Sequence, residues 1–318
     1  MSRRGRSRPA GGGPVVDLTT TVGSLELANP VMTASGTAGH GDELAAYVDL
    51  ASLGAVVVKS LSADPWGGNP APRVHETPAG MINSVGLQGP GVPVWLADEL
   101  PAVLAAGARV VASIWGTSVE DYARAAEMLV DAPEGVIAVE VNVSCPNHHD
   151  RNRMFAHSPT TTAEAIRAAS VCGRPLWAKL SPNVSDLASI AAAAADAGAE
   201  AVTLVNTVLG MAIDPETRRP RLGGGGGGLS GPAIHPVAVR AVYDVHAALP
   251  DLPIVGVGGV AHGVDAVELM LAGASAVQVG TASFADPRSV ERVRDEVEVW
   301  CRTHGVGSVR ELIGDAHV

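Results

Sequence analysis

Residues 136–147 read VIAVEVNVSCPN, and this stretch decides the fold. The apolar run 136–143 predicts a buried strand, and Pro146 ends its pairing. The strand delivers an amide, a hydroxyl, a thiol and a second amide at its carboxyl end. Because the active sites of α/β barrels lie at the carboxyl ends of the strands, Cys145 is well placed to take part in catalysis. The alternative is a small buried thiol that packs like alanine.

The same pattern of a short apolar strand followed by a helical segment recurs along the chain. The expected strands are 29–35, 55–60, 109–115, 136–144, 176–182, 201–206, 253–259 and 276–282. The expected helices are 42–53, 94–106, 118–131, 161–172, 184–197, 235–249, 264–272 and 287–304. Eight consecutive units favour a closed (β/α)8 barrel over a doubly wound sheet. Segments 15–18 and 25–27 are expected to form a hairpin that closes the barrel floor.

The amino-acid composition limits the classes of protein to which this chain can belong. Hydrophobic residues make up 47% of the 318 residues and aromatics only 3%, so the core must consist of Val, Ala, Leu and Ile. The formal net charge of −11 argues against nucleic acid as a partner. The three cysteines have no metal-like spacing, which fits a reducing cytoplasm. No apolar stretch approaches the roughly 18 residues of a membrane span.

The chain divides into a short tail and one domain. Residues 1–14 carry four arginines among Gly, Ser and Pro, without the apolar segment of a secretory signal. We expect a disordered basic tail there; an arm that binds nucleic acid or a partner is the alternative. Residues 15–318 are expected to form a single catalytic domain.

Three long loops indicate the working face of the barrel. They follow expected strands and cover 61–93, 145–160 and 207–231. Loops longer than about 15 residues are usually functional or disordered. The first contains the turn-rich run 83–91, NSVGLQGPG, which can bring backbone close to a ligand. The third contains Gly223–Gly228, which indicates flexibility, and we assign this run no catalytic role.

Strand ends also supply candidate cofactor ligands. Strands seven and eight run into 256–259, GVGG, and 279–282, VGTA, where barrels of this kind usually bind phosphate. Lys59 and Lys179 end two other strands. Each lysine either extends to solvent at the barrel rim or fixes a positive charge beside a redox ring. Together with the thiol and the strand-end amides, they fit a flavin mononucleotide (FMN) site with a polar planar substrate.

Several motifs occur in the order found in one family. They are 34–36 (ASG), 68–73 (GNPAPR), 83–90, 142–147 (NVSCPN), 179–183 (KLSPN), 206–207 (NT), 229–233 (LSGPA) and 258–260 (GGV). From about residue 16 to 313 the chain resembles class 1 dihydroorotate dehydrogenases, most of all the NAD-linked class 1B catalytic subunits. The resemblance implies a (β/α)8 barrel that carries FMN and oxidises dihydroorotate to orotate in pyrimidine biosynthesis.

The resemblance also implies roles for individual residues. Cys145 would be the catalytic base that removes the C5 proton while the C6 hydride passes to flavin N5. The implied substrate-binding residues are Lys59, Asn83, Ser84, Val85, Gly86, Leu87, Asn142, Asn206 and Thr207. The implied FMN-binding residues are Ser35, Lys59, Ser60, Ser113, Asn142, Lys179, Val205, Gly231, Gly258, Gly259, Gly280 and Thr281. Ser113 stands where class 1B members commonly have a flavin-contacting Asn.

Partners follow from the same resemblance. It implies a second subunit with FAD and an iron–sulfur cluster that passes electrons to NAD. This chain has no cysteine cluster that could hold such a centre, so that partner must be a separate chain. The alternative is a class 1A-like homodimer with a soluble acceptor such as fumarate.

His148, His149 and His157 share the loop of Cys145, and we expect no metal there. Two other functions stay open: an FMN reductase of another dihydropyrimidine or secondary metabolite, and a non-catalytic flavin-binding paralogue.

Overall fold

The structure, a computed structural model, describes residues 15–144, 146–147 and 153–317, and its centre is a closed parallel barrel. The barrel strands are β3 (Val31–Thr33), β4 (Val56–Val57), β7 (Val110–Ile114), β8 (Val136–Asn142), β11 (Leu176–Lys179), β12 (Ala201–Leu204), β17 (Ile254–Val257) and β18 (Ala276–Val279). Hydrogen-bonded neighbours run from β3 through β18 round to β4. A parallel bridge between Met32 and Ala55 closes the ring. The (β/α)8 fold is therefore confirmed.

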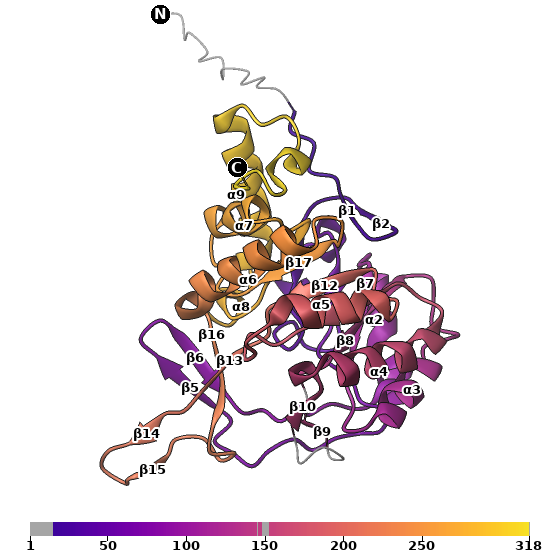
Figure 1. Cartoon of the computed structure of the whole chain (residues 1–318), viewed down its shortest axis with the longest axis vertical. Coiled ribbons are helices and arrows are strands. Elements are labelled where there is room, and N and C mark those ends of the chain that lie inside the picture. Colours follow the sequence, from indigo (N-terminus) through magenta and orange to yellow (C-terminus); the bar gives the residue numbers. More distant parts are fainter. Residues whose placement is uncertain (1–14, 145, 148–152, 318) are drawn as a thin grey trace, which may run out of the picture.

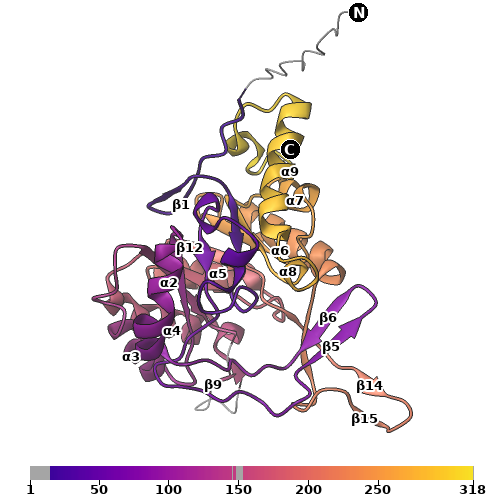
Figure 2. The ribbon, with the colours of Figure 1, turned by 180° about the vertical axis from the view of Figure 1, so that it is seen from behind.

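Helices surround the barrel (Figures 1 and 2). The α-helices are α1 (Val92–Val94), α2 (Leu100–Ala105), α3 (Val119–Glu127), α4 (Pro159–Ala169), α5 (Leu187–Asp196), α6 (His235–Ala248), α7 (Gly263–Leu271), α8 (Ala282–Ala285) and α9 (Ser289–His304). Short 3-10 helices cover Glu43–Ala46, Leu50–Ser52, Phe155–His157, Ser170–Cys172, Pro232–Ile234 and Val309–Leu312. No helix within the described ranges has both the length and the apolar character needed to cross a membrane.

Two expected helices differ in detail. The continuous helix expected at 42–53 is wrong: the segment forms two 3-10 helices, because Asp49 adopts an extended conformation and its carboxylate accepts a hydrogen bond from Ala51 N at 3.1 Å. The helix expected at 94–106 begins two residues earlier, at Val92, and contains a π-helical turn, Trp95–Glu99. Pro101 follows that turn at the start of α2. Proline lacks an N–H, which favours such a local break.

A hairpin closes the floor of the barrel. Strands β1 (Thr20–Val22) and β2 (Leu25–Leu27) pair antiparallel, and Val22 packs against the inward side chains at the amino ends of the barrel strands. The expected second strand is confirmed, but the first one lies further along the chain than 15–18. The two-residue turn at Gly23 (φ 59°) and the next residue fixes this register, whereas Asp17 pairs with Gly307 and Val309 near the carboxyl terminus.

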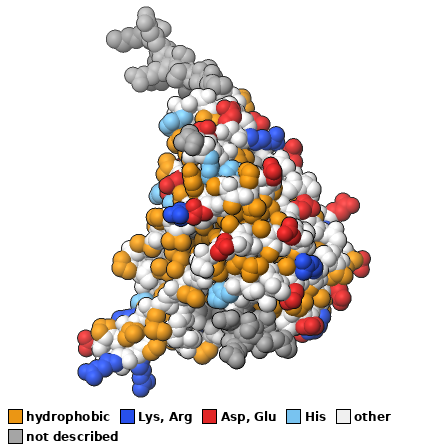
Figure 3. Space-filling model, in the orientation of Figure 1, with side chains coloured by type: hydrophobic (Ala, Val, Ile, Leu, Met, Phe, Trp, Pro, Cys, Tyr) orange, Lys and Arg blue, Asp and Glu red, His pale blue; other side chains and the backbone are white. Residues whose placement is uncertain are grey.

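The long loops contain strands of their own. Strands β5 (Val74–Thr77), β6 (Gly80–Asn83), β13 (Val208–Gly210) and β16 (Gly227–Ser230) form an antiparallel sheet, and β14 (Ile213–Asp214) pairs with β15 (Arg219–Pro220). Strands β9 (Pro146–Asn147) and β10 (Arg153–Met154) pair in the loop after β8. The β14–β15 hairpin projects from the body, with basic side chains gathered at its end (Figures 1 and 3).

The expected flexibility of the glycine run is wrong for its last part. Gly227 and Gly228 belong to β16, where Gly228 pairs with Asn83 of β6. A Cβ on Gly227 would collide with the Asn83 carbonyl, and one on Gly228 would collide with the Thr207 hydroxyl. Close approach of neighbouring chain segments, rather than mobility, therefore explains these glycines.

Candidate active site

A cavity of about 660 Å³ lies at the carboxyl ends of the barrel strands, and β6, β13 and β16 line part of it. Its volume is in the usual range of cofactor and ligand pockets, about 300–1,000 Å³. The predicted site residues that line it are Ser35, Lys59, Ser60, Asn83, Ser84, Val85, Gly86, Leu87, Asn142, Lys179, Val205, Asn206, Thr207, Gly231, Gly258, Gly259, Gly280 and Thr281. The barrel thus brings together residues that are more than 200 positions apart in sequence, from Ser35 to Thr281.

One end of the cavity is a cradle of glycine backbone. A Cβ on Gly259 (φ 71°) would lie 2.7 Å from His235 Cβ, and one on Gly280 would lie 3.2 Å from Ala34 Cβ. Nearby, the Thr281 hydroxyl donates to Ser230 Oγ at 2.8 Å. Backbone without side chains, beside hydroxyl groups, is suited to a phosphate group.

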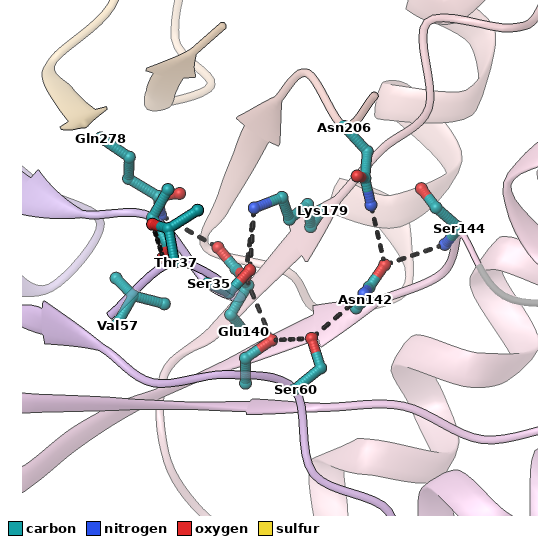
Figure 4. A network of polar contacts seen from close by, with 12 residues as sticks. Ser35, Thr37, Val57, Ser60, Glu140, Asn142, Ser144, Lys179, Asn206 and Gln278 are labelled. Carbon is teal, nitrogen blue, oxygen red and sulfur yellow. Dashed lines mark hydrogen bonds and ion pairs between the residues drawn. The ribbon is translucent and has the colours of Figure 1, made fainter. Parts of the chain in front are cut away.

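Asn142 holds a chain of amides and hydroxyls on the cavity wall (Figure 4). Its Nδ2 donates to Ser60 Oγ at 3.1 Å, and its Oδ1 accepts from Asn206 Nδ2 at 3.2 Å and from the Ser144 amide at 3.1 Å. The Tyr122 hydroxyl donates to the Asn142 carbonyl oxygen at 2.8 Å. These bonds fix the orientation of the side-chain amides before any ligand binds.

The two predicted lysines have different surroundings. Lys179 is almost fully buried; its Nζ donates to Ser35 Oγ at 2.9 Å and lies 3.7 Å from Glu140 Oε1. Burial, followed by repulsion from Arg73, lowers the pKa of the Lys59 ammonium below its ordinary value of 10.5. The Lys59 ammonium therefore loses its proton more readily than that of an exposed lysine, and its side chain lines the cavity.

The predicted substrate loop is braced from behind by Asn69, which the sequence-based assignment omitted. Asn69 Nδ2 donates to Ser84 Oγ at 2.9 Å, and its backbone N–H donates to the Val85 carbonyl oxygen at 3.1 Å. Arg73 Nε in turn donates to the Asn69 carbonyl oxygen at 2.6 Å. Leu87 has φ 59°, a conformation uncommon for a residue with a side chain. The motif that contains Asn69 was visible in the sequence, but nothing there showed what this amide contacts.

Ser113 lies one layer below the cavity wall. Its side chain is fully buried, and its hydroxyl is 2.8 Å from Ser60 Oγ and donates to Glu140 Oε1 at 3.1 Å. Ser60, which does line the cavity, therefore stands next to Ser113 on the cavity side. The predicted flavin contact of Ser113 stays a prediction, and Ser60 is the nearer hydroxyl.

Some of the predicted residues lie outside the part of the chain that the structure describes. The candidate base Cys145, the 1–14 tail, His148 and His149 lie outside the described residues, while His157 ends a short 3-10 helix. Within the described part of the chain, no group of three or more His, Cys, Asp or Glu side chains could hold a metal ion. Cys172 and Cys301 are free and buried, and burial raises the pKa of both thiols.

Several site residues were not predicted. Glu140 and Gln278 are fully buried polar residues in apolar strands, and a lone polar residue in such a strand was the signal that could have identified them. The other unpredicted residues line the cavity and include Ala34, Gly36, Thr37, Val74, Met81, Met154, Gly224, Gly226, Gly227, Gly228, Ser230 and Phe284.

Comparison with known proteins identifies the family. The sequence profile described as "Dihydroorotate dehydrogenase" matches residues 17–300. The "Dihydroorotate dehydrogenase B (NAD(+)), catalytic subunit" of Geobacter sp. (strain M21) is 47% identical over 94% of this chain and 97% of its own length. The protein of the same name from Desulforudis audaxviator is 48% identical over 95% of this chain and 98% of its own. This chain belongs to the dihydroorotate dehydrogenase family.

Proposed function

We propose that this chain is the FMN-dependent catalytic subunit of an NAD-linked dihydroorotate dehydrogenase, which oxidises (S)-dihydroorotate to orotate in pyrimidine biosynthesis. The observation that carries the proposal is a single cavity in which a glycine cradle, two lysines and a row of fixed amides meet. A reductase of another dihydropyrimidine would not require Lys59 and the braced 83–87 loop, which suit a carboxylated pyrimidine. A non-catalytic paralogue would have no need to keep Lys59 and Cys145 together.

FMN fits the residues present. Its phosphate would be held by the backbone at Gly258, Gly259, Gly280 and Thr281, all of which line the cavity, and a Cβ at Gly259 or Gly280 would be crowded by His235 or Ala34. The other residues assigned to it are Ser35, Lys59, Ser60, Ser113, Asn142, Lys179, Val205 and Gly231. When bound, FMN supplies the acceptor for the hydride that leaves the substrate.

The side chains of this chain bind the substrate and hold its proton. The Cys145 thiol, as thiolate, takes the proton from C5 of dihydroorotate, because a cysteine pKa near 8.5 is readily lowered beside cations. Lys59 pairs with the substrate carboxylate. Asn142 and Asn206 orient the pyrimidine through amides that are already fixed in place. The 83–87 loop, with Thr207, covers the substrate and excludes water.

We further propose that electrons leave through a separate subunit that holds FAD and an iron–sulfur cluster, in a heterotetramer built on a homodimer in the cytoplasm. The name "catalytic subunit" of the relatives supports a second subunit. The alternative is a homodimer that uses fumarate. Anaerobically reduced chain mixed with fumarate or with NAD+ separates the two: rapid reoxidation by fumarate alone would contradict the need for a partner.

The function itself is tested with the purified chain alone. We expect a yellow protein with about one flavin per chain, and we expect (S)-dihydroorotate to bleach the flavin absorbance under anaerobic conditions. Dihydrouracil, which lacks the carboxylate, is the matched control and should bleach it far more slowly, because Lys59 then has no anion to pair with. A flavin that neither compound bleaches would favour the non-catalytic paralogue, and equal bleaching by both would favour another substrate.

Lys59→Ala should weaken orotate binding by roughly tenfold to a hundredfold and slow flavin reduction, while much of the flavin stays bound. The effect of pH on orotate affinity has a predictable direction. The ammonium is charged below its pKa, and burial lowers that pKa from 10.5, so wild-type orotate affinity should fall as pH rises, already below 10.5. Titration of orotate against flavin absorbance at several pH values checks this. Lys59→Ala should lack the fall; Lys59→Arg should delay it to higher pH.

A further inference from the structure

Glu140 is a fully buried carboxylate that the mechanism above does not use. It lies in β8, two residues before Asn142, and its side chain points into the barrel between the apolar floor and the cavity. Its Oε1 accepts from Ser113 Oγ at 3.1 Å and lies 3.7 Å from Lys179 Nζ. Its Oε2 accepts from Gln278 Nε2 at 3.0 Å. Figure 4 shows Glu140 with its contacts to Lys179 and Gln278, next to the cavity residues Ser35 and Ser60.

Stability does not explain this carboxylate. A buried ion pair loses the hydration of both ions, and its replacement by apolar residues is often neutral or stabilising. Gln278 supports this view: its Nε2 donates to Glu140, while its buried Oε1 has no hydrogen-bond partner among the residues that the structure describes. The opposite amide orientation would place an oxygen against the carboxylate. The side chains around Glu140 are therefore oriented to stabilise a negative charge on its carboxylate, although this orientation leaves Gln278 Oε1 unsatisfied among the described residues.

Two lines of contact run from Glu140 to the cavity. One passes through Lys179, whose Nζ also donates to Ser35 Oγ. The other passes through the hydroxyls of Ser113 and Ser60 to the Asn142 amide and on to Asn206. Ser35, Lys179, Ser60, Asn142 and Asn206 all line the cavity. A single buried charge thus sets the position of both a cation and an amide chain.

We propose that Glu140 is a positioning residue that holds the Lys179 ammonium at the cavity wall, and that the Glu140–Lys179 pair would thereby set the reduction potential of a bound flavin. This inference rests on the proposed function in that it requires FMN in the cavity. Within the described part of the chain, Lys59 and Lys179 are the cavity-lining groups that carry charge, and Glu140 is the buried anion below them. Reduction adds negative charge to the ring, which Lys179 favours and Glu140 opposes.

The test is the midpoint potential of the bound flavin, measured against redox dyes from pH 6 to 10 without any dihydroorotate. Glu140→Gln is nearly isosteric and removes the anion. We expect its potential to exceed the wild-type value where Lys179 remains charged, with the ratio of reduced to oxidised flavin raised about tenfold, or about 30 mV for two electrons. We expect this gain to disappear as pH rises, with a break absent from wild type, because removal of the counter-ion of a buried ammonium favours its neutral form.

Controls separate positioning from a merely structural role. Thr203→Val changes another fully buried polar residue inside the barrel without changing charge, and it should leave the potential at the wild-type value. Glu140→Asp should recover most of the wild-type pH profile. In a Lys179→Met background, adding Glu140→Gln must still raise the potential and must show no break, because the titrating ammonium is gone. This comparison measures the effect of the Glu140 charge in the absence of Lys179, and the pH break in Glu140→Gln is the sign that Glu140 acts through Lys179.

The outcomes also distinguish this inference from the proposed function. A chain that binds no flavin would overturn both. A wild-type flavin that dihydroorotate bleaches, together with a Glu140→Gln potential that matches wild type and Thr203→Val at every pH, would leave the function standing and overturn the role of Glu140. A potential that shifts without a pH break in Glu140→Gln, and equally in the Lys179→Met background, would show that Glu140 acts by its charge alone and not through Lys179.

Discussion

Cys145→Ser is expected to slow the reduction of the bound flavin by dihydroorotate by about two to four orders of magnitude near neutral pH, the usual contribution of a general base. A serine hydroxyl is a far weaker base than a thiolate in a site tuned for a thiol. Flavin content and orotate affinity should stay near wild type, because serine differs from cysteine by a single atom and the residues assigned to binding, such as Asn206 and Lys179, are unchanged. Anaerobic stopped-flow absorbance measures the rate, and titration measures the affinity.

The chain contains its own matched control for that substitution. Cys172→Ser makes the same chemical change at a buried free thiol whose pKa is raised by burial, on the outer layer of the barrel at the end of α4. It should leave the rate of flavin reduction and its pH profile unchanged, whatever it does to stability. If Cys145→Ser reduces its flavin as fast as Cys172→Ser, with the same pH profile, then Cys145 is not the base.

The barrel strands were predictable because their signal is local. Each is a short run of Val, Ala, Ile and Leu, as in Val110–Ile114, and every residue of that strand is buried. Parallel strands covered on both faces read as continuous apolar runs. The segment 42–53 shows the opposite case: its apolar spacing suits a helix, but the bond from Ala51 N to the Asp49 carboxylate competes with the helical pattern.

The strands in the long loops could not be predicted in the same way. Strand β6 pairs with β16, so that Asn83 faces Gly228 from 145 positions away. Nothing in a Gly-rich segment specifies such a partner, since the side chains that normally indicate a strand are absent. Only the three-dimensional contact explains why residues 227 and 228 are glycines, because neighbouring Asn83 and Thr207 leave no room for a Cβ.

Site residues at the carboxyl ends of strands could be predicted from the sequence, whereas those one layer below the cavity wall could not. Lys59, Asn142 and Lys179 end strands, and parallel strands in a barrel bring their carboxyl ends to one face, so their convergence follows from the fold. How far a side chain lies below that face depends on the tilt and stagger of the strands, which the sequence does not state. Ser113 and Glu140 are therefore the residues whose place required the structure.

The phosphate cradle yields the other large expected effect. Gly280→Val should give folded protein with little or no bound flavin, because a Cβ at Gly280 already lies 3.2 Å from Ala34 Cβ and a branched side chain would extend into the space where the phosphate binds. Gly259→Val should do the same and also lose stability, since its φ of 71° disfavours a β-branched residue.

Gly173→Val supplies the matched control for backbone strain. Gly173 has φ 65°, close to that of Gly259, but a Cβ there meets nothing within 4 Å, and the residue lies at the end of a surface helix. It should lower the melting temperature while keeping the full flavin spectrum. Flavin absorbance per chain and circular dichroism on the same preparations separate the two effects. Full flavin content in both Gly259→Val and Gly280→Val would mean that the phosphate binds elsewhere, because a branched side chain at either position should obstruct the backbone N–H groups that hold the anion.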